Sequence, residues 1–124
     1  MENTFAEIKF FQVKPDRIEE FEAMAKEMET EQKSRQGCIG IRYMKRFYVL
    51  DHFVPRELTR IVKCVKYFSF WEFDTKENYS QAINWYFDAY FKRVGRLLIM
   101  PFDINCGYTV GEESGGKSEE AGLL

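Results

Sequence analysis

The chain has 124 residues, of which 45% are hydrophobic and 17% aromatic, and its formal net charge is −2. Its length predicts one domain around a single core, and its composition is that of a globular protein. The weak net charge argues against nucleic-acid binding. The absence of a signal-like start or an apolar run near 20 residues argues against a membrane protein, so we expect a cytoplasmic one.

The first element is predicted to be a strand over residues 5–13, because apolar and polar side chains alternate along it and Pro15 stops it. A helix is expected next. Asp16 is the candidate N-cap with Glu19 as its capping-box partner, and apolar residues follow at helical spacing. The first part of the chain therefore predicts a strand followed by a helix.

Gly37 is expected to lead into a second strand over residues 38–47, and residues 48–59 then form a connection. The third strand is expected over 60–73. It is apolar in stretches on both faces, which is typical of a strand in the interior of a sheet.

A second helix is predicted from Thr75 to about Leu98, with Asp74 and Glu77 as its capping box. Pro101 is expected to end it. The last strand is predicted over residues 102–110.

This order, β-α-β-β-α-β, is the ferredoxin-like pattern of the α+β class, with two helices on one face of a four-stranded antiparallel sheet. We expect one ferredoxin-like domain over residues 1–110. The glycine-, serine- and glutamate-rich residues 111–124 are expected to be a disordered tail.

One face of such a sheet is left without helices. We expect that face to carry an aromatic set that is too large an apolar patch for a monomer, namely Phe5, Phe11, Tyr67, Trp71 and Phe73. The prediction is a homodimer in which two sheets enclose a shared barrel.

Three cysteines, Cys38, Cys64 and Cys106, are odd in number and widely spaced. Each lies in an apolar, strand-like run. This favours reduced, buried thiols over a disulfide framework or a zinc site.

Four segments resemble the dimeric α/β-barrel proteins, and within them the antibiotic-biosynthesis-monooxygenase-like group. These are Phe11–Phe21, Gly37–Ile41, Phe70–Asp74 and the aromatic second helix, within a resemblance that covers about residues 5–110. The resemblance implies a dimeric barrel. It also implies one of three kinds of protein: a cofactor-independent monooxygenase acting on phenols or quinols, a haem-degrading monooxygenase, or a member with no known activity.

For the haem-degrading type, the resemblance implies an Asn on the first strand, a Trp on the second helix and a His further along that helix. Trp85 matches the Trp. Glu7 and Lys9 stand in place of the Asn, and Gly95 stands about where the His would fall. We therefore expect no cofactor, because haem iron needs an axial ligand and the expected one is missing; haem stays open as the alternative.

Three polar residues are candidates for catalysis. His52 is the only histidine and would serve as a base near neutral pH, although a lone histidine in a connection is commonly a surface residue. Arg42 and Asn105 lie among apolar strand positions and would bind an anionic or phenolic oxygen in a cavity. The alternative for Arg42 is a solvent-facing charge on an edge strand.

Aromatic residues are the candidates for substrate binding. Trp71 and Trp85 would stack on a planar ligand, and the tyrosines would donate a phenolic hydrogen bond. Each would equally serve the core or the dimer interface. The predicted substrate-binding set is Trp71, Trp85, Tyr67, Tyr86 and Tyr90.

Two hypotheses follow. The first is a cofactor-independent monooxygenase that oxidises a small quinol or phenol in a water-excluded pocket. The second is a non-enzymatic dimeric barrel that binds a small hydrophobic or haem-like ligand.

Overall fold

A computed structural model describes residues 3–60 and 63–116. Within these residues the chain forms strands and helices in the following order: β1 (Phe5–Val13), α1 (Ile18–Gln32), β2 (Cys38–Lys45), β3 (Tyr48–Asp51), β4 (Val54–Glu57), β5 (Val65–Phe73), α2 (Lys76–Gly95) and β6 (Asp103–Tyr108).

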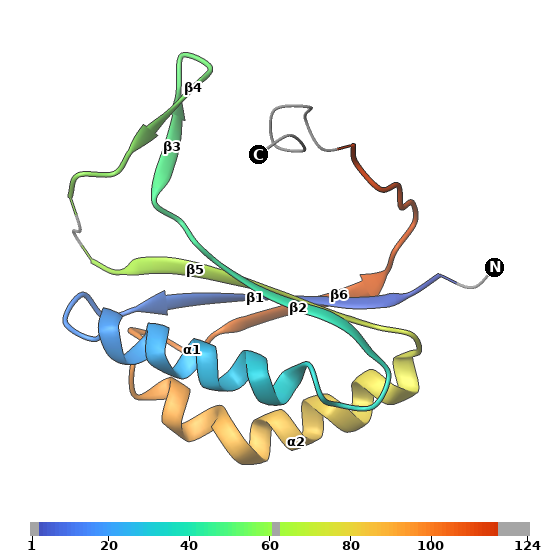
Figure 1. The fold of residues 1–124 in the computed structure, drawn as a ribbon. Coiled ribbons are helices and arrows are strands. Elements are labelled where there is room, and N and C mark those ends of the chain that lie inside the picture. Colours follow the sequence, from blue (N-terminus) through green and yellow to red (C-terminus); the bar gives the residue numbers. More distant parts are fainter. Residues whose placement is uncertain (1–2, 61–62, 117–124) are drawn as a thin grey trace.

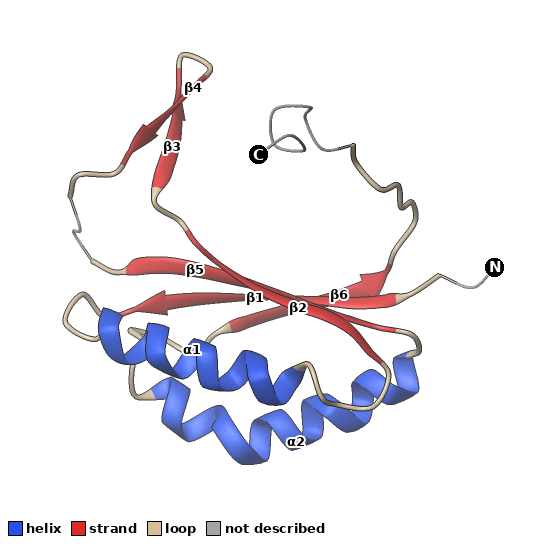
Figure 2. Ribbon diagram, in the orientation of Figure 1, coloured by secondary structure: helices blue, strands red, loops and turns tan. Residues whose placement is uncertain are grey.

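The main sheet has four antiparallel strands in the order β2-β5-β1-β6. Both helices lie on one face of this sheet (Figures 1 and 2). The predicted ferredoxin-like α+β fold is confirmed, and β5 is an interior strand as its two-sided apolar pattern predicted.

Several predicted boundaries are corrected. β2 ends at Lys45 instead of residue 47, and β5 begins at Val65 instead of residue 60, while residues 61–62 lie outside the described part of the chain. α2 ends at Gly95, well before Pro101. The last strand is shorter at both ends than predicted, because its backbone pairs with β1 only from Asp103 to Tyr108.

The connection over residues 48–59 is not irregular. β3 and β4 form a separate two-stranded hairpin, with His52 and Phe53 at positive φ angles of 51° and 66° in its two-residue turn. Positive φ at both central residues is the geometry of the tight hairpin turns that match strand twist. The hairpin rises from the side of the sheet opposite to the helices (Figure 1).

The predicted helix caps are also corrected. α1 has Arg17 at its N-cap position and no side-chain cap, so the Asp16 capping box does not form. α2 is capped by Thr75, whose hydroxyl accepts a hydrogen bond from the backbone N–H of Asn78 at 3.1 Å. Asp74 instead accepts a bond from the Asn78 side chain.

The predicted open face is the wrong one. The side chains of Phe5, Phe11, Tyr67, Trp71 and Phe73 are all buried under the helices, where they form the core. The side chains on the other face of the sheet include Ile8 on β1 and Met44 on β2, which are 46% and 59% exposed. We call this helix-free side the open face.

The three cysteines are less buried than predicted. Cys38 and Cys64 are partly exposed and Cys106 is exposed, because β2 and β6 are edge strands and Cys64 precedes β5. Residues 111–116 lie in no helix or strand, and the rest of the predicted tail lies outside the described residues. No helix in the described residues is long and apolar enough to cross a membrane.

Candidate active site

The most unusual feature of the core is a buried ion pair on β1. Glu7 and Lys9 are both fully buried, and the Lys9 ammonium donates to the two carboxylate oxygens of Glu7 at 2.8 and 2.6 Å. Their parity on the strand places both side chains on the helix-covered face. Burying two charges costs several kcal/mol per ion and is only partly repaid by their attraction, so the pair calls for an explanation beyond stability.

Aromatic rings of β5 and α2 surround the pair. The Lys9 ammonium lies 4.8 Å from the ring centre of Trp71 and 4.1 Å from that of Tyr86, which are cation–π distances. The Tyr79 hydroxyl donates to Glu7 at 2.7 Å. The charges are thus held in a dry, aromatic layer between the sheet and α2.

Hydrogen-bond donors without partners gather in the same layer. In the β1–β5 pairing, Ser69 lies opposite Lys9 and Trp71 lies opposite Glu7. The Ser69 hydroxyl and the Trp71 indole N–H are buried, and neither has a partner at hydrogen-bond geometry among the described residues; the indole N–H is nevertheless close enough to the Cys38 thiol to act on its pKa. The side-chain amide nitrogen of Gln32 is a third such group. Buried polar groups are nearly always satisfied, so unpartnered donors mark a place where an acceptor is expected.

Burial shapes the acid–base properties of this layer. Desolvation lowers the pKa of Lys9, although the Glu7 carboxylate opposes the shift. Desolvation raises the pKa of Tyr79 and Tyr86 above their ordinary range, with the Glu7 charge adding to the shift in both. Burial thus opposes the charged form of Lys9 and of both tyrosines in this layer.

We call this group the Lys9 centre; it consists of Glu7, Lys9, Ser69, Trp71, Tyr79 and Tyr86. An ammonium group, a hydroxyl and an indole N–H can together stabilise an anionic oxygen in a water-poor environment. Glu7 and Tyr79 can hold or pass a proton. Tyr79 also lies 4.0 Å from the thiol of Cys106, which is exposed at the edge strand β6.

The predicted substrate-binding residues lie on the helix side of the sheet. Trp71 and Tyr86 belong to the Lys9 centre, whereas Tyr67 and Tyr90 point to carboxylates of α1: Tyr67 donates to Glu22, and Tyr90 to Glu27 and Glu31. Trp85 is only partly buried, with the Arg35 guanidinium 4.2 Å from its ring centre. Substrate contact by these residues stays a prediction.

The predicted catalytic residues lie elsewhere. His52 is at the hairpin tip with a 96% exposed side chain, and its Nδ1 lies 2.8 Å from Asp51. Arg42 is on the open face, with its guanidinium 5.6 Å from the ring centre of Phe70, and Asn105 pairs with Ile8 on the same face. Because the sheet separates that face from the core aromatics, the structure does not bring the two predicted sets together within one chain.

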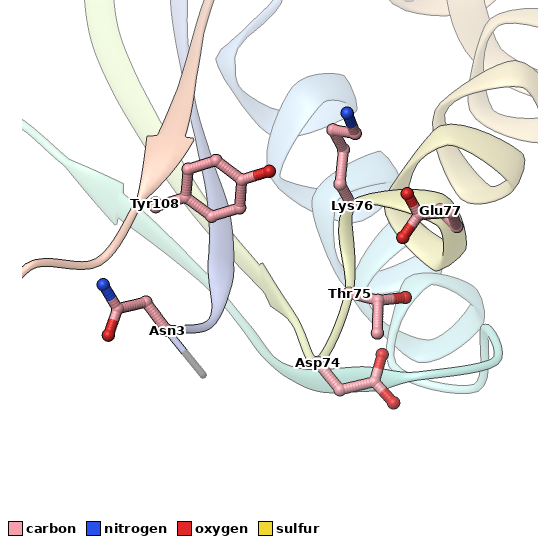
Figure 3. Close-up of a pocket in the computed structure, with 6 residues that line it drawn as sticks. All are labelled: Asn3, Asp74, Thr75, Lys76, Glu77 and Tyr108. Atoms are coloured by element: carbon pink, nitrogen blue, oxygen red, sulfur yellow. The ribbon is translucent and has the colours of Figure 1, made fainter. Parts of the chain in front are cut away.

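A surface hollow of about 390 Å³ lies at the start of α2 (Figure 3). The Tyr108 ring extends from β6 toward the first turn of α2, and the other residues that line the hollow are Asn3, Asp74, Thr75, Lys76 and Glu77. Its mixed charges select no particular ligand. The described residues contain no group of three or more His, Cys, Asp or Glu able to hold a metal ion.

Comparison with known proteins supports the fold. Over 90% of this chain and 99% of its own, the Rv0793 protein of Mycobacterium tuberculosis superposes with a TM-score of 0.67 at 17% identity. A Bordetella bronchiseptica protein named "Putative antibiotic biosynthesis monooxygenase" superposes over 88% of this chain and 99% of its own, with a TM-score of 0.61 at 19% identity. The chain shares their ferredoxin-like fold.

A third similar structure, a dimeric ferredoxin-like protein from an uncultured marine organism, matches with a TM-score of 0.64 at 13% identity over 90% of this chain and all of its own. No protein-family model and no curated protein matches the sequence. The fold part of the resemblance to the antibiotic-biosynthesis-monooxygenase-like group is therefore confirmed.

Sequence reasoning missed three members of the Lys9 centre, Glu7, Lys9 and Ser69, whereas Tyr79 was among the tyrosines considered as phenolic donors. A signal was present, because Glu7 and Lys9 share strand parity with Phe5, Phe11 and Val13. Two opposite charges on the apolar side of a strand predict a buried pair. Charged residues at alternate positions of a strand usually indicate its solvent-exposed face, so the buried position of Glu7 and Lys9 was not predicted.

Proposed function

We propose that this protein is a cofactor-independent monooxygenase that oxidises a small phenol or quinol at the Lys9 centre. The observation that supports this most directly is the buried Lys9 ammonium beside the unpartnered donors Ser69 and Trp71. Such a set suits an anionic oxygen, and a phenolate is the species that reacts with dioxygen without a cofactor.

The proposed reaction needs no external reductant. A phenol and O₂ give a quinone and water: one oxygen atom replaces the hydrogen on a ring carbon, and the other leaves as water with that hydrogen and the phenolic proton. All four electrons come from the substrate. Lys9, Ser69 and Trp71 stabilise the phenolate, and Glu7 accepts the phenolic proton with Tyr79 as its hydrogen-bond donor.

This assignment gives the acid–base roles to residues of the core. Catalytic roles for His52, Arg42 and Asn105 would require the substrate to lie on the open face or against the hairpin. The Lys9 centre is favoured because it combines charge, unpartnered donors and exclusion of water in one place.

We further propose that the active form is a homodimer in which the open faces of two chains meet. Ile8 and Met44 leave apolar surface on a sheet face that no helix covers, and one neighbour of the same fold is named as dimeric. In light scattering the wild type should have the mass of two chains, and Ile8→Asp should shift it toward one chain. A monomeric wild type contradicts the proposal.

One observation favours the non-enzymatic alternative, a dimeric barrel that only binds a hydrophobic ligand. The rings of Trp71, Tyr86 and Tyr90 are at most 1% exposed, so a substrate must displace side chains to reach the centre. Under this alternative the buried pair would only fix the packing of β1 against α2.

Oxygen uptake with a panel of phenols and hydroquinones separates the two functions. Tyr79→Phe keeps the packed ring but removes the donor to Glu7, and should lower the rate by roughly a hundredfold. Ser69→Ala removes a donor that has no partner, so it should fold well and still slow turnover. Tyr48→Phe, on the exposed hairpin, is the matched control and should leave the rate unchanged.

If the wild type oxidises every compound of the panel only at the uncatalysed rate, the monooxygenase proposal is wrong and the ligand-binding function remains. If oxidation is catalysed but Tyr79→Phe and Ser69→Ala match the wild type, the reaction takes place away from the Lys9 centre.

A further inference from the structure

The β3–β4 hairpin has one apolar face. Residues directly opposite each other in an antiparallel pair share a face. Leu50 lies opposite Pro55, and the pair of Tyr48 and Glu57 continues the same face toward the base of the hairpin. Phe53 adds an apolar ring at the tip. We call Leu50, Phe53 and Pro55 the arm surface.

The other face of the hairpin is charged at its centre. It carries Val49, Asp51, Val54 and Arg56. Asp51 and Arg56 form an ion pair of 2.9 Å across the two strands, so these two charges compensate each other within the hairpin. The two faces therefore differ in chemistry, and the arm surface is the one suited to an apolar contact.

The arm surface is highly exposed for an apolar one. Within the described residues, the exposed fraction is 66% for Leu50 and 93% for Phe53. The turn also holds His52 and Phe53 at positive φ, a conformation that bulky residues rarely adopt. A two-stranded hairpin alone is marginally stable at best in water. Together these features indicate a surface that packs against another molecule.

The hairpin stands on the side of the sheet that the proposed homodimer covers (Figure 1). Its base is fixed to the main sheet, because the Arg46 N–H donates to the Lys66 carbonyl at 2.8 Å. Each of its strands has four residues, which gives a height of about 13 Å at about 3.3 Å per residue. Two sheets that pack face to face lie only about 10 Å apart. The hairpin is therefore tall enough to reach the flank of a second chain on the open face.

We propose that the hairpin is an arm that grips the second chain of the homodimer through the arm surface. In a two-fold dimer each chain contributes one arm, and each arm contacts the flank of the other chain. The occupant is a second copy because the arm stands where that copy would lie. This inference rests on the proposed homodimer and is independent of the oxygenase reaction at the Lys9 centre.

Sedimentation equilibrium of the full-length protein measures this contact. Leu50→Lys places a charge in the arm surface, and a two-fold dimer carries the substitution twice, so the dissociation constant of the dimer should rise about a hundredfold. The matched control is Val54→Lys, on the opposite face of the same hairpin at a side chain that is 62% exposed. Its ammonium group would lie opposite Asp51, which favours the hairpin, and the dissociation constant should stay within about threefold.

A second variant separates contact with the partner from the stability of the hairpin. Asn-Gly is the residue pair that best fits a two-residue turn with positive φ at both positions. His52→Asn with Phe53→Gly should therefore stabilise the hairpin and still weaken the dimer about tenfold, because the Phe53 ring is lost. Circular dichroism and amide hydrogen exchange show whether each variant keeps its fold and its hairpin.

Photo-cross-linking locates the contact. Benzoylphenylalanine in place of Phe53 should join two chains on irradiation, and mass spectrometry of the product identifies the segment that it touches. The same label in place of Glu29, an exposed residue of α1, is the control and should give no cross-linked dimer.

The outcomes distinguish the arm from the homodimer itself. A wild type that stays monomeric overturns both. If the wild type is a dimer and neither Leu50→Lys nor the Asn-Gly turn changes its dissociation constant by more than about threefold, only the arm is wrong. The arm is also wrong if the label at position 53 reacts only within its own chain.

Discussion

The buried ion pair leads to a stability prediction that can be worked through a double-mutant cycle. Lys9→Met removes the ammonium and leaves the Glu7 carboxylate fully buried, with Tyr79 as its donor. Removing one partner of a buried pair costs about 3–5 kcal/mol, which is a large share of the roughly 5–15 kcal/mol that holds a domain folded.

The opposite single change should cost less. In Glu7→Gln the buried Lys9 loses its counter-charge, and burial, which already lowers the pKa of Lys9, then favours its neutral form and limits the cost. We expect about 2 kcal/mol, mostly from lost hydrogen bonds to a charged group. With both changes, no charge remains buried, and the stability should lie within about 1 kcal/mol of the wild type or above it. The coupling between the two sites should therefore be about 3 kcal/mol or more.

Urea denaturation followed by circular dichroism measures the cycle at one fixed protein concentration, because association would add to the apparent stability. A matched control is the cycle Arg17→Gln and Glu20→Gln, which removes an exposed ion pair of 2.6 Å on α1 and should show no measurable coupling. The reasoning is refuted if Lys9→Met costs less than about 1 kcal/mol or if the costs of the two core changes simply add.

Two other features lead to predictions of stability. Gly37 has φ +82°, and a Cβ at this position would lie 2.8 Å from the Asn78 Cβ. Gly37→Ala should therefore destabilise the protein by about 2 kcal/mol in thermal unfolding. Gly40→Ala is the control, because Gly40 has open space around it, and equal effects of the two substitutions would contradict the prediction. Burial raises the pKa of Tyr43, Tyr79 and Tyr86 above the ordinary 10.0. The unfolded chain therefore releases these protons first, so stability should be intact below pH 10 and fall as the pH rises further. Tyrosinate absorbance that exceeds the contribution of the exposed Tyr48 and Tyr108 before the circular dichroism signal is lost would show that the three buried hydroxyls are not protected.

Local patterns were sufficient to predict most of the fold. The alternation over Phe5–Val13 predicted β1 with its observed bounds, and the two-sided apolar run before Phe73 predicted an interior strand. These predictions hold because strand and helix periodicity is a property of neighbouring residues. The β3–β4 hairpin was missed since its turn, His52-Phe53, lacks the Gly or Asn that usually adopts positive φ.

The candidate site was predicted less well because it depends on contacts between distant segments. Trp71 and Tyr86 were named as substrate-binding residues and do lie in the Lys9 centre. Arg42 and Asn105 were placed with them, but the sheet separates the two sets. Strand parity shows which residues share a face, and it does not show which face the helices cover.

By itself, the sequence determined the order of the main elements, the ferredoxin-like class and the existence of two chemically different faces on each strand. The tertiary structure alone decided that the face with Glu7 and Lys9 is the covered one. That choice depends on free energy summed over the whole sheet: burying the rings of Phe11, Trp71 and Phe73 outweighs the cost of the two charges, which neutralise each other once both are in place.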